Sequence, residues 1–334
     1  MMNRTKPGGG GTVSFLVTTS CQNRCVFCFE QGACPSGDML SYEFIASRLD
    51  ELGGRVKKVD LAGGEPMTHP KIHEIAKLIK DRMLGLTVTT NGLALADRRE
   101  AEWLCGVADR IVLSIHAGNA EDYAWVTGNE NGFAKVERAV ANLADICKPG
   151  RVLVNTTVVK QTMDGLPETG KLVSRLGHAR WHVTNPFPVG GASAGYKEIA
   201  PRLTRFREIV PGLVAEANSL GLDLGFSFFP TCAIGCLPGL NNDLLEPGQA
   251  NGFVLDHESN PHHPGDLTFE RVFSRKCRSC GLKGKACMGV AARYVEEFGE
   301  DEIQVCGRAS KVNTGSTGRD YSAGKGHGNG DDIA

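Results

Sequence analysis

The 334-residue sequence contains no apolar run near the roughly 18 residues that a membrane-spanning helix needs. Its first residues, MMNRTKPGGGG, lack the apolar core of a signal peptide. An excess of charge is also absent, since 37 Lys and Arg stand against 38 Asp and Glu. A protein whose main partner is nucleic acid would show a basic excess. These absences predict a cytoplasmic protein with neither a membrane nor a nucleic acid as partner.

Cysteine, in contrast, is plentiful, with 12 residues in the chain. In a large chain without a secretion signal we expect reduced thiols, which favours metal or cluster ligation over disulfides. Three cysteines stand near the start of the chain: Cys21, Cys25 and Cys28. Six more gather toward the end of the chain: Cys232, Cys236, Cys277, Cys280, Cys287 and Cys306. The remaining three lie apart from both groups: Cys34, Cys105 and Cys147.

Between residues 12 and 190 a short apolar β-branched run, a turn and an amphipathic helix alternate about six times. A helix after the N-cap residue Ser41 is expected to stop at Gly53-Gly54. The predicted strands are 12–18, 56–61, 86–90, 110–115, 152–159 and 181–184, with helices such as 70–83 and 132–147 between them. This α/β pattern predicts a partial (β/α)6 TIM-like barrel with its site at the C-terminal ends of the strands.

We divide the chain into a flexible N-terminus (1–11), a core (12–199), a C-terminal region (200–312) and a disordered tail (313–334). The C-terminal region begins with a helix at 202–220 that contains Pro211 and a strand at 222–228. A stretch rich in Cys, Gly and Pro follows, with few periodic apolar residues. It cannot build much core alone, so we expect a small Cys-rich lobe organised by a metal.

The first cysteine group places three thiolates within eight residues of a loop that follows the first strand. Three thiolates can hold three irons of a cubane cluster and leave the fourth iron open. A structural zinc site would want four closed ligands. A third reading, buried apolar cysteines, fits a loop position poorly.

The Cys-x3-Cys-x2-Cys spacing, with an aromatic residue just before Cys28, resembles the signature of the radical S-adenosylmethionine (SAM) family. Gly63-Gly64-Glu65-Pro66, after the second strand, resembles that family's GGEP segment. The resemblance covers about residues 12–190. It implies a radical SAM oxidoreductase or maturase whose [4Fe–4S] cluster cleaves SAM reductively to a 5′-deoxyadenosyl radical. That radical would abstract hydrogen from a peptide or small-metabolite substrate, with a one-electron reductant such as flavodoxin or ferredoxin as partner.

The same resemblance implies the residues that contact SAM. Gly63 and Gly64 would let the backbone approach the methionyl amine, and Glu65 would help to hold that cation. Asn91 ends the third strand; the remaining candidates are Ser114 and Asn155 for the ribose or carboxylate, and the backbone of Phe27 for the adenine. Each of them is also an ordinary residue of a strand end or turn, and His116 is as well explained by a structural role.

The second cysteine group resembles the SPASM/Twitch extensions of radical SAM enzymes, which bind auxiliary iron–sulfur clusters. Too few cysteines remain for two clusters, so we expect one auxiliary [4Fe–4S] cluster. Three ligands are assigned to Cys277, Cys280 and Cys287, and the fourth stays open among Cys232, Cys236 and Cys306. The alternative is a zinc ribbon, and with it a zinc-stabilised binding module without redox chemistry.

The substrate is the least specified feature of the sequence. Because the first cluster cysteine is residue 21, we expect no room for a leader-peptide-binding domain before it. A peptide substrate would then need a separate recognition protein, or the substrate is small. The segment 186–191, rich in Pro and Gly, is expected either to line the substrate opening or to be a plain connecting loop.

Overall fold

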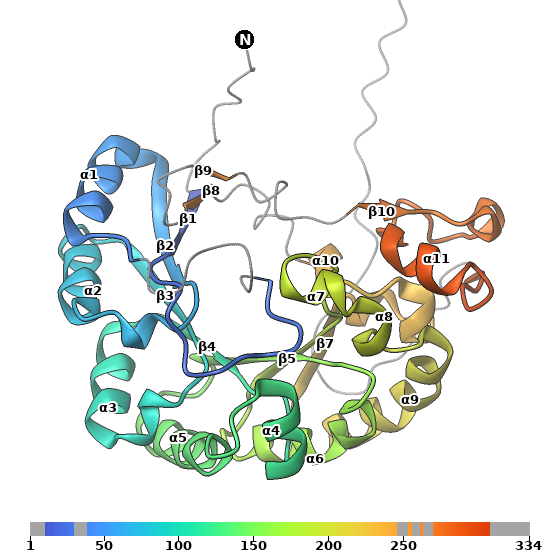
Figure 1. Cartoon of the computed structure of the whole chain (residues 1–334), viewed down its shortest axis with the longest axis horizontal. Coiled ribbons are helices and arrows are strands. Elements are labelled where there is room, and N and C mark those ends of the chain that lie inside the picture. The colour runs from blue at the N-terminus through green and yellow to red at the C-terminus, as the bar shows by residue number, and fades with distance from the viewer. Residues whose placement is uncertain (1–10, 30–38, 246–252, 256–260, 263–269, 308–334) are drawn as a thin grey trace, which may run out of the picture.

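The computed structural model is built on one sheet with the strand order β7-β6-β5-β4-β3-β2-β1-β8-β9 (Figure 1). It describes residues 11–29, 39–245, 253–255, 261–262 and 270–307. The strands of this sheet are β1 (Gly11–Leu16), β2 (Val56–Ala62), β3 (Gly85–Thr90), β4 (Arg110–Ser114), β5 (Val152–Thr157), β6 (Arg180–Thr184), β7 (Asp223–Ser227), β8 (Phe253–Leu255) and β9 (Pro261–His262).

Strands β1 to β7 are parallel, and each pairs with the next one in the chain. At the free edge of β1, β8 adds in parallel and β9 adds antiparallel to β8. Because β7 and β9 are the two ends of this order, the barrel is open, as predicted. The consecutive run β1 to β7 has one strand more than the predicted six, since the strand expected in the C-terminal region pairs with β6 as β7.

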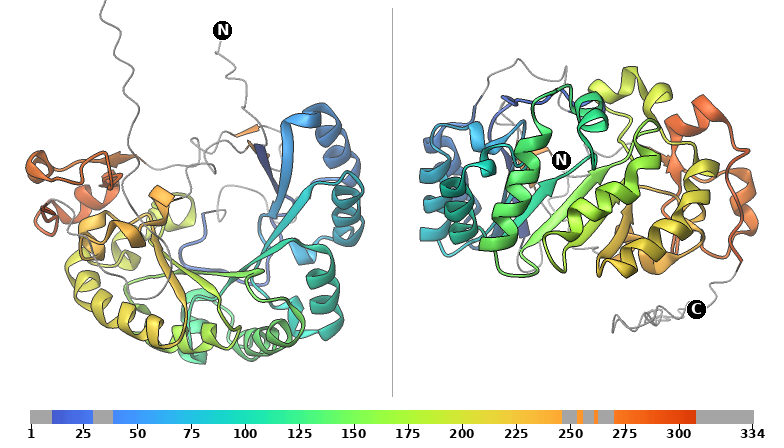
Figure 2. Two further views of the ribbon diagram at one scale, coloured as in Figure 1. Left: turned by 180° about the vertical axis from the view of Figure 1, so that it is seen from behind. Right: turned by 90° about the horizontal axis from the view of Figure 1, so that it is seen from below.

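Helices α1, α2, α3, α5, α6 and α9 lie along the outside of this curved sheet (Figures 1 and 2). Ser41 caps α1 as predicted, its side chain accepting a 3.0 Å hydrogen bond from the N–H of Phe44, and Gly53 ends the helix. The helices are α1 (Tyr42–Leu52), α2 (Ile72–Asp81), α3 (Arg98–Val107), α4 (Ala120–Thr127), α5 (Phe133–Ile146), α6 (Leu166–Ser174), α7 (Gly191–Ala194), α8 (Tyr196–Ile199), α9 (Leu203–Ser219), α10 (Asn242–Leu245) and α11 (Ala292–Phe298).

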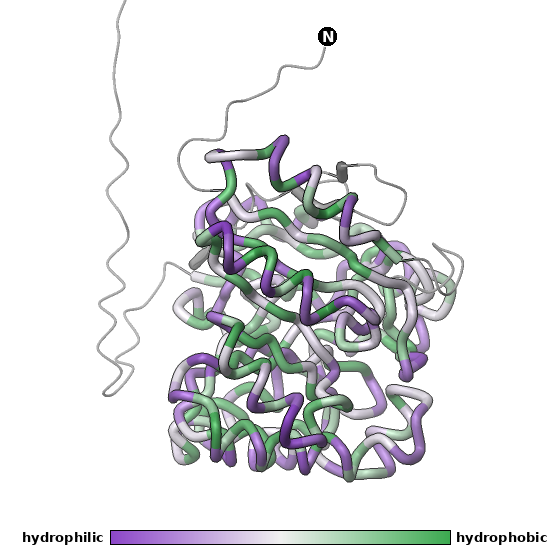
Figure 3. The backbone as a smooth tube through the Cα atoms, turned by 90° about the vertical axis from the view of Figure 1, so that its left-hand side faces the viewer, coloured by the Kyte–Doolittle hydropathy of each residue, from purple (hydrophilic) through white to green (hydrophobic). Residues whose placement is uncertain are grey.

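Alternation along the strands separates two faces of the sheet. In β1, Val13 and Phe15 are fully buried, whereas Ser14 is half-buried. Ser14 meets Asp60 of β2, which in turn accepts a hydrogen bond from Thr89 of β3. The outer helices show the matching pattern of hydrophobic and hydrophilic residues along each turn (Figure 3). The apolar core therefore lies between sheet and helices, and the other face of the sheet carries polar groups.

The C-terminal lobe packs against α9 at the β7 side of the molecule, away from α1 and α2 (Figures 1 and 2). It contains α11 and the ribbon of β10 (Arg271–Val272) and β11 (Val290–Ala291). The hydroxyl of Tyr294 accepts a hydrogen bond from the N–H of Leu203 and donates one to Glu302. Leu282, Val290, Tyr294 and Ile303 are buried and join the core of the barrel.

Two further expectations can be compared with the described residues. Residue 11 begins β1, while the rest of the N-terminal segment and the whole tail 313–334 lie outside the described residues. None of the helices described is both long and apolar enough to pass through a membrane.

Candidate functional site

The three cysteines of the first motif occupy the loop that follows β1, and all three are free thiols. The loop is held by the C-terminal end of α4: the N–H of Arg24 donates to the carbonyl of Thr127 (2.6 Å), and the N–H of Val26 donates to that of Val126 (3.0 Å). The N–H of Cys28 donates to the carbonyl of Cys25 (3.0 Å), which closes a turn between the second and third thiols. The three thiols are thereby brought together at the C-terminal end of the first strand.

Burial and the neighbouring thiols both affect the ionisation of Cys21 and Cys25. Burial raises the pKa of the Cys25 thiol, and the charges of Cys28 and Cys21 raise it further. Burial raises the pKa of Cys21 as well, against a hydrogen bond from the N–H of Asn23 (3.4 Å). Neighbouring thiols resist ionisation because their negative charges repel one another. A cationic metal centre compensates these charges, so the same thiols can ionise and bind it as thiolates.

The donor set fits an iron–sulfur cluster. Within the described residues no group of three or more His, Cys, Asp or Glu side chains is arranged to hold a metal ion. In a cubane each thiolate binds a different iron, so its ligands surround a volume instead of converging on one point. Three thiols on one loop would leave the fourth iron for another ligand.

Gly63 and Gly64 bring the end of β2 against the backbone of this cysteine loop. The N–H of Gly64 donates to the carbonyl of Thr18 (2.6 Å), and that of Glu65 donates to the carbonyl of Ser20 (2.8 Å). A Cβ at Gly63 would lie 2.5 Å from the Thr18 oxygen, and one at Gly64 would lie 2.5 Å from the Ser20 oxygen. Glycine is therefore required here for a contact between backbones.

Glu65 is only 1% exposed and joins β2 to the end of β3. Its carboxylate accepts hydrogen bonds from the hydroxyl of Thr90 (2.7 Å), the N–H of Asn91 (2.6 Å) and the N–H of Met67 (3.1 Å). Burial raises the pKa of this carboxyl group, and the three hydrogen bonds act in the opposite direction. The amide of Asn91 donates to Gln22 (3.2 Å) and approaches Cys21 Sγ (3.7 Å), so Glu65 is coupled to the cysteine loop through Asn91.

Ser114 and Asn155 face each other in the register of β4 and β5. The Oδ1 of Asn155 accepts a 2.6 Å hydrogen bond from the hydroxyl of Thr184 on β6, a contact that sequence reasoning missed. The alternation of side chains along β6 could have indicated this contact, because it places Thr184 on the same face of the sheet as His182. These three strand ends thus place polar groups side by side.

Phe27 packs edge-on against His116, with ring centroids 4.6 Å apart. The Nδ1 of His116 accepts a hydrogen bond from the N–H of Thr157 (3.1 Å), which leaves the ring proton on Nε2. Burial lowers the pKa of His116 to about 4. A neutral histidine therefore links the cysteine loop to the ends of β4 and β5.

The segment 186–191 meets the far end of the cysteine loop. Phe187 packs against Phe228, with centroids 4.3 Å apart. Gly190 has a φ of 57°, and a Cβ there would overlap the carbonyl of Phe29 at 1.8 Å. This segment and the cysteine loop are therefore neighbours at the C-terminal ends of the strands.

The second cysteine group surrounds a pocket between the barrel and the C-terminal lobe. Cys232, Cys277, Cys280 and Cys287 are free thiols that line it. Burial raises the pKa of Cys277, and the nearby charges of Cys232, Cys280 and Cys287 contribute in the same direction. Cys287 Sγ accepts hydrogen bonds from the N–H groups of Thr231 and Gly289, both at 3.4 Å. Four thiols and N–H donors to sulfur are the donor set of an iron–sulfur cluster.

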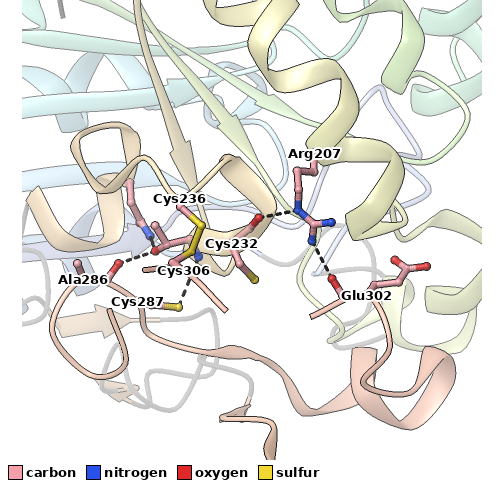
Figure 4. Close-up of a disulfide and its surroundings, with 9 residues drawn as sticks. Arg207, Cys232, Cys236, Ala286, Cys287, Glu302 and Cys306 are labelled. Carbon is pink, nitrogen blue, oxygen red and sulfur yellow. Dashed lines mark hydrogen bonds between the residues drawn. A yellow bond between two sulfur atoms is a disulfide. The ribbon is translucent and has the colours of Figure 1, made fainter. Parts of the chain in front are cut away.

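Two candidate ligands of this site are bonded to each other. Cys236 and Cys306 form a disulfide, with Cα atoms 5.6 Å apart, beside the free thiol of Cys232 (Figure 4). Of the three residues among which the fourth ligand was left open, only Cys232 is therefore a free thiol in this structure. Cys105 and Cys147 form a second disulfide, which also contradicts the expectation of reduced thiols throughout. The partners are 70 and 42 residues apart, and only the fold brings them together.

Arg207 of α9 holds two walls of this pocket, a role that its sequence position did not reveal. Its Nε donates to the carbonyl of Cys232 (2.8 Å), and its Nη2 donates to that of Glu302 (2.7 Å) (Figure 4). The hydroxyl of Thr231 donates to the carbonyl of Ala286 from the third wall. Three segments distant in the chain are thereby joined around the thiols.

An open parallel barrel with a three-thiol loop after its first strand defines a candidate iron–sulfur enzyme. Residues 15–173 match the model of the Radical SAM superfamily. Residues 15–173 of the chain therefore form a radical SAM domain. The predicted resemblance is thus confirmed.

Two curated relatives and one solved structure illustrate the similarity. The AdoMet-dependent heme synthase of Methanosarcina barkeri is 29% identical over 182 residues, 53% of this chain and 51% of that protein. Mycofactocin maturase MftC of Mycolicibacterium smegmatis is 26% identical over 233 residues, 69% of this chain and 58% of MftC. Streptococcus suis SuiB bound to S-adenosylmethionine has a TM-score of 0.62 at 17% identity, covering 89% of this chain and 76% of SuiB. The SuiB comparison shows a shared fold, and the chain spans about half the length of the curated relatives it matches.

Proposed function

We propose that this protein holds a [4Fe–4S] cluster on Cys21, Cys25 and Cys28 and cleaves SAM reductively. The substrate of the resulting 5′-deoxyadenosyl radical is a peptide or a small metabolite. The observation that carries the proposal is the group of three free, interacting thiols at the end of β1, beside the Glu65 and Asn91 network. When bound, the cluster supplies one electron to the sulfonium of SAM, a step that side chains cannot perform.

The residues around the thiols have positioning roles in this proposal. Gly63 and Gly64 fix the cysteine loop against β2, and Glu65 fixes the end of β3 next to Cys21. Ser114 and Asn155 offer polar groups to the ribose or carboxylate of SAM, and the backbone of Phe27 faces its adenine. Glu65 is buried under three donors, so any contact with the methionyl amine uses the lone pairs that those donors leave free.

The second thiol group is proposed to bind one auxiliary [4Fe–4S] cluster through Cys277, Cys280, Cys287 and Cys232. Cys232 is the candidate for the fourth ligand because it is free, lines the pocket and interacts electrostatically with Cys287 and Cys280. Cys306 also lines the pocket, but it is bonded to Cys236.

The proposed substrate class, a peptide or a small metabolite, is supported by the names of two relatives. One relative is named for heme synthesis and the other for mycofactocin maturation. The substrate space is proposed to lie between the cysteine loop and the segment 186–191. The electron is proposed to come from a low-potential one-electron carrier such as flavodoxin or ferredoxin.

The test is anaerobic incubation of the reconstituted protein with SAM and dithionite. The wild type should form 5′-deoxyadenosine, and the variant with Cys21, Cys25 and Cys28 all changed to Ala should not. Equal amounts from both proteins would refute the assignment. Zinc without iron in the wild type would favour the binding module instead.

A further inference from the structure

A strongly basic loop, residues 275–285, carries two of the four pocket thiols. It contains Arg275, Lys276, Arg278, Lys283 and Lys285, and residues 271–291 include no acidic residue. All five cations are exposed. The chain as a whole has a net charge of −1, so this concentration of positive charge is a local feature.

These cations are not neutralised within the described part of the chain. None of the five forms an ion pair there; Lys276 donates to the backbone carbonyl of Asp301, and Lys283 lies over the ring of Phe273. Of the acidic residues in 270–307, three are engaged by arginines outside the basic loop: Glu296 and Glu297 by Arg293, and Glu302 by Arg202. The five cations thus outnumber Glu270, Glu300 and Asp301, the acids of this range that form no ion pair with another described residue.

Large apolar side chains are exposed on the same lobe. Phe273 is 37% exposed, Met288 49% and Val305 46%. Phe273 lies two residues before the basic loop, and Met288 directly follows Cys287. Apolar contacts surrounded by charge are the composition of a surface that binds a protein partner.

The thiols beneath this surface are close to solvent. Cys277, Cys280 and Cys287 are only partly buried, whereas Cys232 lies deeper, against the barrel. A redox centre bound here would have its outer side near the basic loop. Electron tunnelling slows steeply with distance, so this side is the one from which an electron can enter.

We propose that the basic loop, with Phe273, Met288 and Val305, is the docking surface for an acidic one-electron carrier protein. The carrier gives one electron to the auxiliary cluster: the carrier is oxidised, the cluster is reduced, and no covalent bond forms or breaks. This inference rests on the proposed auxiliary cluster and adds the route by which electrons reach it. Exposed apolar side chains beside the partly buried thiols favour a redox protein over a nucleic acid, which binds mainly through its phosphates.

The experiment compares two triple charge reversals in reconstituted protein. The test variant is Arg275→Glu/Arg278→Glu/Lys285→Glu, three exposed residues whose side chains form no hydrogen bond or ion pair within the described part of the chain. The matched control is Lys57→Glu/Lys135→Glu/Lys148→Glu, three exposed lysines on β2, on α5 and before β5. Iron content and visible absorption should equal those of the wild type in both variants.

The first readout is binding of an acidic bacterial flavodoxin to the immobilised protein. We expect the test variant to bind at least about tenfold more weakly than the wild type, because charges at an interface edge steer association. The control should bind normally. Wild-type binding should weaken as salt rises from about 0.1 to about 1 M, which shortens the Debye length from about 10 to about 3 Å. Equal binding by the test variant and the wild type would overturn the proposal.

The second readout is formation of 5′-deoxyadenosine with two electron donors. With reduced flavodoxin the test variant should be at least about fivefold slower, whereas dithionite, which needs no docking surface, should restore the wild-type rate. If the wild type fails even with dithionite, the proposed function fails, and the binding readout still decides the docking surface. Tight binding of single-stranded RNA by the wild type and not by the test variant, with flavodoxin bound by neither, would also overturn the proposal.

Discussion

The backbone N–H of Asn91 donates a 2.6 Å hydrogen bond to the buried carboxylate of Glu65. Asn91 belongs to the turn after β3, and Glu65 to the turn after β2. The side chain of Asn91 in turn reaches Gln22 and Cys21. This contact links two strand ends with the cysteine loop, so the position of Cys21 depends on Glu65, which is not among the proposed cluster ligands.

Replacing Glu65 tests this linkage. In Glu65→Ala, the donors of Met67, Thr90 and Asn91 lose their acceptor, and each buried group left unpaired costs about 1–3 kcal/mol. We expect the free energy of unfolding to fall by about 3 kcal/mol, SAM to bind at least about tenfold more weakly, and iron content to stay near that of the wild type. Urea unfolding, SAM titration and iron analysis measure these effects.

Glu130→Ala, a change at an exposed residue near α5, is the control and should behave like the wild type. Loss of iron from Glu65→Ala with unchanged SAM affinity would assign Glu65 to cluster retention instead.

Gly64 tests the contact between β2 and the cysteine loop. In Gly64→Ala the new Cβ would lie 2.5 Å from the carbonyl oxygen of Ser20, the residue before Cys21. Overpacking of this kind costs about 1–3 kcal/mol. We expect lower stability together with incomplete iron loading, because the backbone that carries Cys21 must move.

The matched substitution is Gly212→Ala within α9, where no atom outside the adjacent helix backbone lies within 4 Å of the added Cβ. Alanine in a helix should stabilise the protein by about 0.5–1 kcal/mol relative to glycine. Full iron loading in both variants would show that the approach at Gly64 is not needed for the cluster site.

Local sequence patterns predicted much of this structure. Ser41 and Gly53 bound α1 as expected, because capping depends on neighbours in the chain. Cys21, Cys25 and Cys28 were recognisable because a loop of eight residues needs no tertiary partner to hold them together.

Long-range pairings could not be read from the sequence in the same way. The strand β7 was predicted, but its pairing with β6 depends on how α9 packs. The Cys236–Cys306 disulfide joins residues 70 positions apart, and Arg207 reaches Cys232 and Glu302 only in the folded chain. Such contacts have no local signal, so the sequence left the proposed fourth auxiliary ligand open.

Asp60 gives a prediction about pH. It lies on β2, with Oδ2 3.5 Å from the Ser14 hydroxyl and Oδ1 3.3 Å from the Thr89 hydroxyl. Burial raises its pKa from 3.8 to about 6, against these two hydrogen bonds. Because the folded pKa lies above the unfolded one, the contribution of Asp60 to stability is fully present below pH 4. It is lost as the pH rises to about 6.

This loss amounts to at most about 3 kcal/mol, at about 1.4 kcal/mol per pKa unit. Asp60→Asn should therefore remove a component of the pH dependence between pH 4 and 6 and be more stable than the wild type at pH 8. Urea unfolding across this range is the measurement, with the exposed Asp301→Asn as control. Parallel pH profiles for wild type and Asp60→Asn would show that Asp60 is not responsible.

The auxiliary site gives the sharpest contrast, because Cys232 and Cys306 both line the pocket but differ in bonding. Two cubanes correspond to about eight irons per chain. Cys232→Ser should reduce this to about four, since it removes the proposed fourth ligand, and should leave stability without metal near that of the wild type. Cys306→Ser should keep about eight irons and lose about 2–4 kcal/mol of stability, the typical contribution of a disulfide. Cys236→Ser should match Cys306→Ser in both respects, because the two residues share one bond.

Iron analysis, visible absorption and urea unfolding after removal of thiol reductants separate these outcomes. The variant lacking Cys21, Cys25 and Cys28 isolates the auxiliary site, because the iron it retains, about four per chain, belongs to the second thiol group alone. Adding Cys232→Ser to that variant should remove this iron, whereas adding Cys306→Ser should not. The reverse result, with iron lost on removing Cys306 and kept on removing Cys232, would make Cys306 the ligand. The Cys236–Cys306 bond would then have to open before the cluster assembles, since a sulfur bonded to another sulfur cannot serve as a thiolate ligand.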